Sequence, residues 1–253
     1  NHLTSSGIDS HDVVPDSPTN TFATLNPNFA FNPTLSNGLS SQPANLIEGN
    51  LKSDTTLAVS SVEANMTFKP NQIWYFECYA YGDTIVGIQA TPVASGQFPG
   101  LHTTLSAALQ TDGTDFNISD TGLTYGNSIV GVCVNLINNT IQFRTSSWGN
   151  VVNLPPAMIG RTDIVAAARS ARFSGDYVHY NFGQDATFGG TQTTPTQVYT
   201  DANGLGKFYY EPPAGALALC SANLDKVKNR PTAYEFDETN KHIITYHDDA
   251  RIS

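Results

Sequence analysis

The sequence predicts an all-β fold, an antiparallel two-sheet sandwich with irregular N- and C-terminal arms. The clearest support is a hairpin pattern in residues 125–143, YGNSIVGVCVNLINNTIQF. Ile129–Leu136 is dense in apolar and β-branched side chains, and Ile141–Arg144 alternates apolar with polar side chains, which is the period of a half-buried strand. Between them Asn138-Asn139 fits a tight two-residue turn, because Asn tolerates positive φ. Short strand patterns separated by turn signals elsewhere favour a sandwich or a barrel.

Strand candidates in the first half of the chain are bounded by Gly, Pro, Asn and Asp. Ile73–Ala80 (IWYFECYA) is the strongest and reads as a central strand, because its side chains are almost continuously apolar. A tight turn at Gly82-Asp83 joins it to Thr84–Ala90, and a long Gly-rich insertion follows at residues 91–123. In chain order, the candidates before the hairpin are Phe22–Leu25, Ala44–Lys52, Thr56–Val62, Ile73–Ala80, Thr84–Ala90, Leu105–Leu109 and Asp115–Ile118.

Strand patterns continue after the hairpin, with two polar loops at 183–197 and 199–207. Residues 163–172 come nearest to a helical pattern, but a strand at Ile164–Ala168 fits the surroundings better. A sandwich suits this set, because its edge strands alternate and its middle strands are apolar. The later candidates are Val151–Pro156, Ile164–Ala168, Tyr177–Phe182, Phe208–Tyr210, Ala216–Cys220 and His242–Tyr246.

Charge excludes two classes of partner. The formal net charge is −10, with only 12 Lys and Arg, whereas nucleic-acid binding needs many cations to neutralise phosphates. Anionic membranes are disfavoured for the same reason, and no run of 18 apolar residues predicts a transmembrane helix. With 40% hydrophobic and 13% charged residues, the composition suits a secreted or particle-borne β protein more than a cytosolic enzyme.

The chain divides into three predicted parts. Residues 1–20 are polar and turn-rich and form an N-terminal arm, 21–224 form the sandwich, and 225–253 form a charged C-terminal tail or linker. A single all-β domain of this length is common. Because the sequence opens at Asn1 without a signal-peptide pattern, we expect it to be a piece of a longer polypeptide.

Neither cysteines nor histidines suggest a metal or cofactor site. Cys78, Cys133 and Cys220 form an odd set without zinc spacing, and we expect buried free thiols. The six histidines do not repeat at ligand spacing, and nucleotide-binding or serine-hydrolase motifs are missing. We therefore expect neither a metal nor a cofactor, and no catalytic residue.

Acidic residues leave two alternatives open. A glycan-degrading enzyme would need two carboxylates about 5–10 Å apart, and the loops at 111–120 and 200–206 have the Asp and Asn density of calcium sites. Turn aspartates more often accept local backbone N–H groups, which is our interpretation here. We expect Glu77 to point to the solvated face of its strand. The carboxylate pairs considered are Asp112 with Asp115, Asp83 with Glu77, and Asp201 with Glu211.

Loop residues supply the candidate binding contacts. Trp74 lies in a central strand and should be core, whereas Trp148 lies in a Ser-Ser-Trp-Gly turn. The Trp148 indole either stacks on a sugar or a neighbouring subunit, or folds back as a lid on the sandwich end. The candidate ligand- or partner-binding residues are Trp148, Tyr125, Phe98, His102, Asp201 and Asn203.

Four central segments resemble, in order, the strands of the SPRY domain, a concanavalin A-like sandwich. Ile73–Tyr79 is similar to its "KWYWEV" strand, Ile85–Ala90 to "VGIA", and Val178–Phe188 to "VNFGQRPF". Residues 125–143 are similar to "YGNGDVIGVALDLDNGTLTF", although Asn135 replaces an Asp there. Further departures are Asn127-Ser128 for Gly-Asp, a longer turn at Arg144–Gly149, and the 91–123 insertion.

Both ends of this region resemble SPRY-like domains of bacteriophage virion proteins. Ser17–Pro27 (SPTNTFATLNP) is similar to their opening and Tyr209–Leu224 (YYEPPAGALALCSANL) to their ending. The resemblance implies a non-enzymatic virion protein of a tail fibre, spike or capsid decoration, whose loops at 91–123, 145–150 and 184–206 serve host recognition or adhesion.

Two alternatives to recognition remain, a purely structural decoration or cementing protein and a glycan-degrading spike enzyme. The partners that the resemblance implies are other virion proteins and a host-surface glycan or protein. Location in the virion and a homo-oligomer, a trimer by analogy, follow from the same resemblance.

Overall fold

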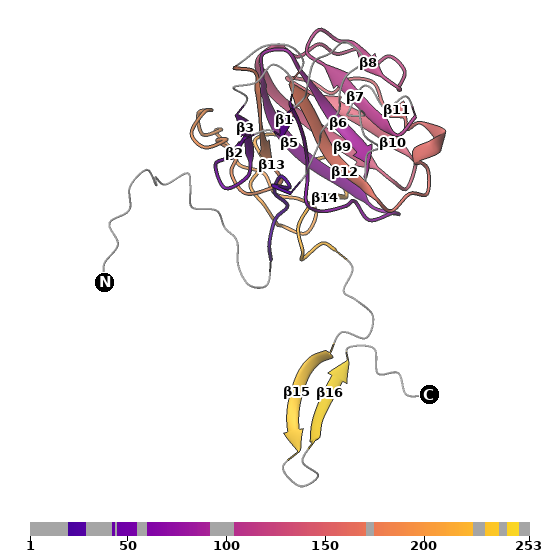
Figure 1. Cartoon of the computed structure of the whole chain (residues 1–253), viewed down its shortest axis with the longest axis vertical. Coiled ribbons are helices and arrows are strands. Elements are labelled where there is room, and N and C mark those ends of the chain that lie inside the picture. The colour runs from indigo at the N-terminus through magenta and orange to yellow at the C-terminus, as the bar shows by residue number, and fades with distance from the viewer. Residues whose placement is uncertain are drawn as a thin grey trace, which may run out of the picture. The chain divides into compact units, whose positions relative to one another are not determined.

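Two antiparallel β-sheets form the larger part of this computed structural model (Figure 1). The structure describes residues 20–28, 42–43, 45–54, 60–91, 104–170, 175–224, 231–237 and 242–247. The chain forms two compact units, Asn1–Asn223 and Leu224–Ser253. The predicted all-β sandwich is confirmed in the first unit. The described residues contain only one short 3-10 helix, η1 (Pro156–Met158), and no helix long and apolar enough to span a bilayer.

The smaller sheet of the sandwich has six strands. Its central strands are apolar, and β6 is buried along its whole length. The pairing is antiparallel except between the first two strands. In spatial order the strands are β1 (Gln42–Pro43), β4 (Ser60–Glu63), β12 (Ile164–Ser170), β6 (Thr84–Ala90), β7 (Ser106–Gln110) and β8 (Asp115–Phe116).

The larger sheet has eight strands, and the candidate site described below lies on its side of the sandwich. Strand β14 (Ala216–Ala218) pairs in parallel with the start of β5, outside the main path of the sheet. The strands of the main path, in spatial order, are β11 (Val152–Asn153), β10 (Thr140–Arg144), β9 (Ser128–Asn135), β5 (Ile73–Tyr81), β13 (Tyr177–Asn181), β3 (Lys52–Asp54) and β2 (Asn45–Ile47).

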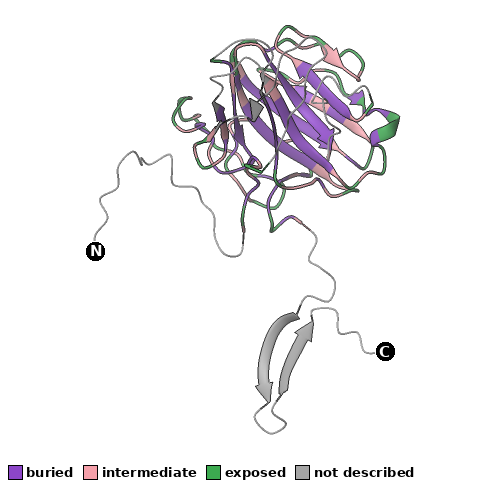
Figure 2. Cartoon of the chain, in the orientation of Figure 1, coloured by how far each residue is buried: buried purple, intermediate pink, exposed green. Residues whose placement is uncertain are grey.

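Residues 74–78 and 80 of strand β5 are buried, so side chains on both of its faces are covered. Figure 2 shows the central strands of the sandwich mostly in purple, the colour of buried residues. Because side chains alternate along a strand, Trp74 and Phe76 lie on one face and Tyr75 and Glu77 on the other. The first face belongs to the core between the sheets, where Phe76 stacks on Phe68 with ring centroids 6.0 Å apart. Trp74 is fully buried there, as predicted.

The hairpin at 125–143 forms as β9 and β10, but its predicted two-residue turn is wrong. Thr140 pairs with Asn135, so the connection spans the four residues 136–139, and of its two asparagines only Asn139 has positive φ, at 56°. The Asn135 Oδ1 accepts the N–H groups of Ile137 and Asn138, each at 3.0 Å. This side-chain cap stabilises a longer turn than the primed type that we expected.

Other predicted boundaries also change. Two predicted strands, Phe22–Leu25 and Phe208–Tyr210, form only single bridges in the part of the chain that the structure describes. Val151–Pro156 shortens to β11 and is followed by η1. The second unit contains a pair, β15 (Pro231–Asp237) and β16 (His242–His247), of which the sequence predicted only β16.

Candidate ligand groove

The segment after β13 and the turn that holds Trp148 both pack on the outer face of the larger sheet. The fully buried Tyr75 ring meets Phe208 at 5.1 Å and Trp148 at 6.2 Å between ring centroids, both edge-on. Gly131 on β9 pairs with Glu77, and a Cβ added there would come 2.5 Å from the Tyr75 hydroxyl. The outer face therefore packs as a second small core beneath the loops.

Glu77 lies inside this second core, so our prediction of a solvated position was wrong. The side chain is fully buried. Its Oε1 accepts from the Tyr75 hydroxyl at 2.9 Å and the Tyr210 N–H at 2.7 Å. Its Oε2 accepts from the Tyr209 N–H at 2.8 Å and the Asn181 Nδ2 at 3.1 Å. Burial raises the pKa of Glu77 to about 7, while these four hydrogen bonds oppose the rise.

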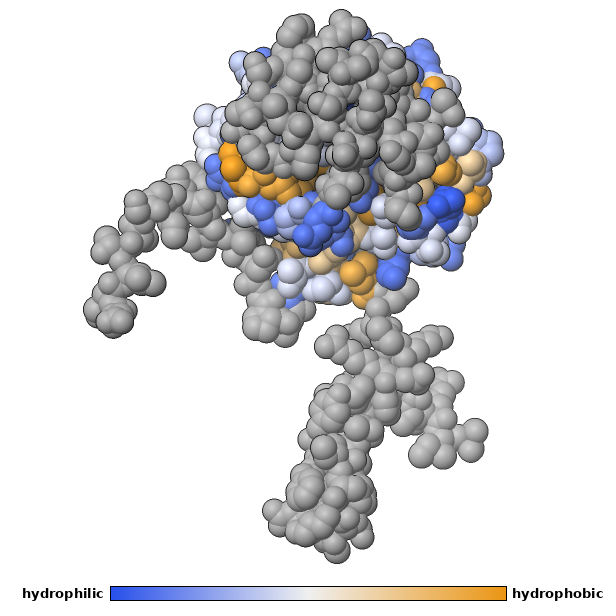
Figure 3. All heavy atoms as spheres, viewed as in Figure 1, coloured by the Kyte–Doolittle hydropathy of each residue, from blue (hydrophilic) through white to orange (hydrophobic). Residues whose placement is uncertain are grey.

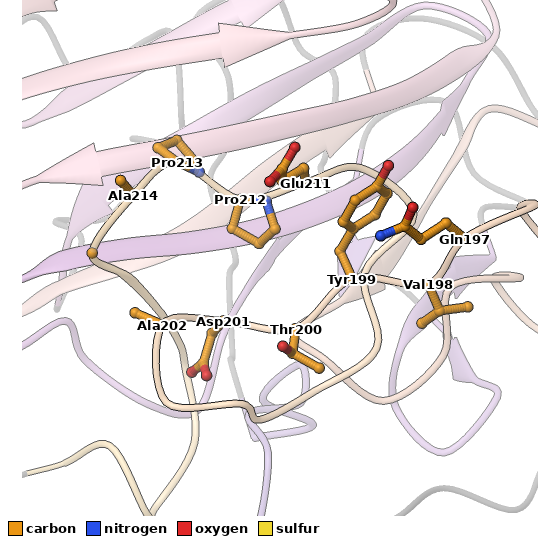
Figure 4. A pocket seen from close by; sticks show the side chains of 11 residues that line it. Gln197, Val198, Tyr199, Thr200, Asp201, Ala202, Glu211, Pro212, Pro213 and Ala214 are labelled. Atoms are coloured by element: carbon orange, nitrogen blue, oxygen red, sulfur yellow. The ribbon is translucent and has the colours of Figure 1, made fainter.

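The segment that Glu77 fixes leads directly into one wall of a surface groove of about 290 Å³ (Figure 4). One wall is residues 197–202, where the first polar loop ends and the second begins, and the other is residues 211–215, which contain the two prolines. In Figure 4 the side chains of Gln197, Tyr199 and Glu211 gather at one end of the groove. The lining residues are Gln197, Val198, Tyr199, Thr200, Asp201, Ala202, Glu211, Pro212, Pro213, Ala214 and Gly215.

Asp201 holds the first wall in place. Its Oδ1 accepts the N–H groups of Asn203 and Leu205 at 2.9 and 2.8 Å. Its Oδ2 accepts the Ala218 N–H at 2.8 Å and the Asn223 Nδ2 at 2.6 Å. The carboxylate is buried and both of its oxygens are occupied, so Asp201 acts as a structural cap, although we had predicted it as a contact residue.

Backbone hydrogen bonds join the first wall to the residues that flank the second wall. The Ala202 N–H donates to the Ala216 carbonyl at 3.0 Å, close to the end of the second wall. The Tyr199 and Phe208 backbones exchange two hydrogen bonds of 3.0 and 2.8 Å. The groove is therefore formed by well-anchored backbone before a ligand arrives, which reduces the entropy lost on binding.

A cation–aromatic cluster adjoins the groove at Glu211. The Arg144 guanidinium lies over the Tyr210 ring at 4.5 Å and over the Trp148 ring at 5.5 Å. Its Nη1 donates to the Glu211 carbonyl at 3.2 Å. Trp148 is half-buried against Tyr75, which agrees with the folded-back alternative and still leaves part of the indole at the surface.

Of the remaining predicted contact residues, neither Tyr125 nor Asn203 lines the groove. Tyr125 is buried, and its hydroxyl donates to the carbonyl of Thr84 at 2.6 Å. Asn203 is exposed, and its Nδ2 donates to the Asn223 Oδ1 at 2.8 Å. Phe98 and His102 lie outside the described residues. Of the six residues, Asp201, Asn203 and Trp148 lie at or beside the groove.

The turn aspartates cap local groups, as the sequence suggested. Asp112 accepts the Thr114 N–H at 2.9 Å, and Asp115 accepts the N–H and the hydroxyl of Thr121 at 2.9 and 2.8 Å. Asp83 accepts from the Gln110 Nε2 at 2.8 Å. The described residues hold no group of three His, Cys, Asp or Glu side chains placed for a metal ion.

The three cysteines are buried and free, which confirms the prediction from the sequence. Burial raises the pKa of Cys133 to about 12 and also raises the pKa of Cys78 and Cys220. The thiols therefore remain protonated at neutral pH, as expected of small core side chains.

Neither family models nor curated proteins match this chain. Similar solved structures include two SPRY domains. The SPRY domain of human HERC1 is 12% identical, with a TM-score of 0.44, and the match covers 55% of this chain and 92% of that one. The PSpry domain of TRIM65 is also 12% identical, with a TM-score of 0.45, and the match covers 63% of this chain and 92% of that one. Both belong to the family that the sequence segments resemble.

Proposed function

We propose that this chain is a non-enzymatic recognition module of a bacteriophage virion, in a tail fibre, spike or capsid decoration, and that its groove binds a host-surface glycan. The observation that carries the binding role is the anchored groove between residues 197–202 and 211–215. The virion context is supported by the resemblance of residues 17–27 and 209–224 to virion proteins.

The lining of the groove suits a glycan. Tyr199 offers an aromatic ring, and Gln197, Thr200 and Glu211 offer amide, hydroxyl and carboxylate groups at the same opening. Binding sites commonly combine an apolar surface with a few polar groups that fix orientation. The second wall adds the rings of Pro212 and Pro213, so the cleft can hold a sugar ring by packing and by hydrogen bonds.

The carboxylates at the groove favour binding over hydrolysis. Glycoside hydrolysis uses two carboxyl groups that flank the scissile bond. Asp201 is buried with both oxygens occupied, and Glu77 is buried and accepts the N–H groups of Tyr209 and Tyr210, which precede the second wall. Among the described residues that line the groove, Glu211 is then the one carboxylate at the surface.

The test is binding of fluorescently labelled envelope polysaccharide, purified from candidate host bacteria, to the whole chain. We expect Tyr199→Ala to lower affinity by about five- to 150-fold, because the stacking ring is lost and about 1.4 kcal/mol corresponds to a factor of ten. A stacked ring contributes on the order of 1–3 kcal/mol. Tyr81→Ala is the matched control, since Tyr81 is 41% exposed and does not line the groove. Equal affinity of Tyr199→Ala and wild type would contradict the groove assignment, and release of reducing ends would contradict the non-enzymatic role.

An exposed apolar patch favours a second candidate, a structural decoration or cementing protein. Ile137 and Ile159 are 57% and 51% exposed and line one hollow of about 180 Å³ beside the β9–β10 turn. The face drawn in Figure 3 shows hydrophobic patches set among hydrophilic residues. Ile137→Glu with Ile159→Glu should abolish self-association or incorporation into particles if this role holds, while polysaccharide binding persists. Sedimentation analysis and particle assembly measure the two properties.

A further inference from the structure

In all four of its hydrogen bonds, the Glu77 carboxylate is the acceptor and the partner is the donor. Two of the donors are the backbone N–H groups of Tyr209 and Tyr210, which cannot act as acceptors. The third comes from Asn181, whose amide is fixed because its Oδ1 accepts the Gly183 N–H at 2.8 Å. The fourth comes from the Tyr75 hydroxyl, which can turn and become an acceptor. The site is therefore complementary to the ionised carboxylate.

Protonation would affect the two oxygens of Glu77 differently. A proton needs an acceptor, and Tyr75 is the one partner that can provide it, so the proton belongs on Oε1. The protonated oxygen then accepts weakly, and the Tyr210 N–H loses most of its hydrogen bond. The Tyr209 N–H binds Oε2, which remains a carbonyl oxygen and keeps its role.

The hydrogen bond of Tyr210 matters for the groove because the next residues in the chain form its second wall. The Tyr210 ring covers Arg144, whose Nη1 binds the carbonyl of Glu211. Glu211 begins the second wall, and Pro212 and Pro213 continue it. Loss of the Tyr210 anchor therefore loosens the wall at the end where Tyr199 and Gln197 lie.

We propose that Glu77 is a positioning residue that makes ligand binding in the groove dependent on pH, because its ionised carboxylate holds Tyr210 and thereby the Glu211–Pro213 wall. The ligand part of this inference rests on the proposed function, whereas the structural part concerns the free protein. Glu77 itself does not contact the ligand.

Burial, opposed by the four hydrogen bonds, places the transition in the neutral range. Desolvation of the fully buried group raises the pKa of Glu77 to about 7 against its four hydrogen bonds. The neighbours on the adjoining strands, Gly131 on β9 and Asn181 on β13, carry no charge. Arg144 on β10 is the nearby cation. The titratable and charged groups around the carboxylate are Tyr75, Cys78, Arg144, Tyr209 and Tyr210.

The test follows the backbone amides of the ligand-free chain by ¹H–¹⁵N NMR between pH 5 and 9. We expect the Tyr210 amide proton to shift upfield as the pH falls, with a midpoint near pH 7, and the Tyr209 amide to shift much less. Glu77→Gln should abolish the titration of the Tyr210 amide. If this variant fails to fold, the comparison of the Tyr209 and Tyr210 amides in the wild-type chain still tests the proposal. Equal shifts, absent shifts, or the same titration in Glu77→Gln would overturn the proposal.

A second arm uses the labelled envelope polysaccharide. If the groove is complete only while Glu77 is ionised, the competent fraction falls about tenfold between pH 8 and pH 6, and the apparent Kd rises by the same factor. Constant affinity together with a titrating Tyr210 amide would overturn the link to the groove. Absence of polysaccharide binding at every pH would contradict the proposed function, and the amide measurement would still decide the role of Glu77.

Discussion

Replacing Glu77 with glutamine removes the carboxylate at nearly constant side-chain volume. Because the two oxygens receive donors from both sides, the new NH2 group must face the N–H of Tyr209 or of Tyr210 in either orientation. A buried N–H without an acceptor costs about 1–3 kcal/mol. At pH 5, where the folded wild-type protein holds Glu77 mostly protonated, we expect the variant to be less stable by about this amount.

At pH 8 the stability difference between Glu77→Gln and the wild type should disappear or change sign. The pKa of Glu77 is raised from 4.5 to about 7, so the folded protein retains a proton that the unfolded chain releases, and wild-type stability falls as the pH rises through this window. At about 1.36 kcal/mol per pH unit, the loss is about 3 kcal/mol. Glutamine does not titrate, so Glu77→Gln avoids this loss. At pH 8 its free energy of unfolding should equal or exceed that of the wild type.

Urea unfolding at pH 5 and pH 8, followed by tryptophan fluorescence, measures both differences. Other titrating groups are present in both proteins, so they cancel in the comparison. Glu211→Gln is the matched control, because it changes an exposed carboxylate in the same segment and should keep the wild-type pH dependence. A stability difference between Glu77→Gln and wild type that is the same at both pH values would refute the reasoning.

Two further changes test the packing of the outer face. Gly131→Ala places a methyl group 2.5 Å from the Tyr75 hydroxyl, so we expect a loss of about 1–3 kcal/mol in unfolding free energy, with the open Gly126→Ala as a neutral control. Burial lowers the pKa of His179 to about 3, so wild-type stability falls as the pH drops below 6.5, by about 3 kcal/mol at pH 4. His179→Gln should lack this loss, and identical acid dependence of the two proteins in urea titrations would contradict the assignment.

The central strands could be predicted because their side chains carry the signal themselves. Thr84–Ala90 was predicted with its observed bounds as β6, and Ile164–Ala168 was correctly preferred as a strand over a helix. The errors fall where one or two backbone bonds decide the structure. Phe22–Leu25 has the composition of a strand but forms only bridges, to Cys220 and to Ala64, which lie far away in the sequence.

Glu77 shows why the buried site was missed. We treated β5 as a strand with one solvent-exposed face, on which the Glu77 carboxylate would point to water. Its nearly continuous apolar run was itself the signal that both faces are buried, as in strands covered on two sides. The apolar run in β5 could not show which segment covers it. The donors of that segment, Tyr209 and Tyr210, lie more than 130 residues further along the chain.

The groove illustrates a different limit. Sequence reasoning correctly took Asp201 as a turn residue that accepts N–H groups, and it also offered Asp201 as a contact residue. The same carboxylate reaches Ala218 and Asn223, beyond its own turn, and this long reach joins the loop to the strand after the second wall. Both oxygens of Asp201 already accept hydrogen bonds that hold the first wall. Asp201 therefore cannot bind a ligand without giving up some of these bonds. We therefore propose Tyr199 and Glu211, which the same two segments place at the groove, as the contact residues in its stead.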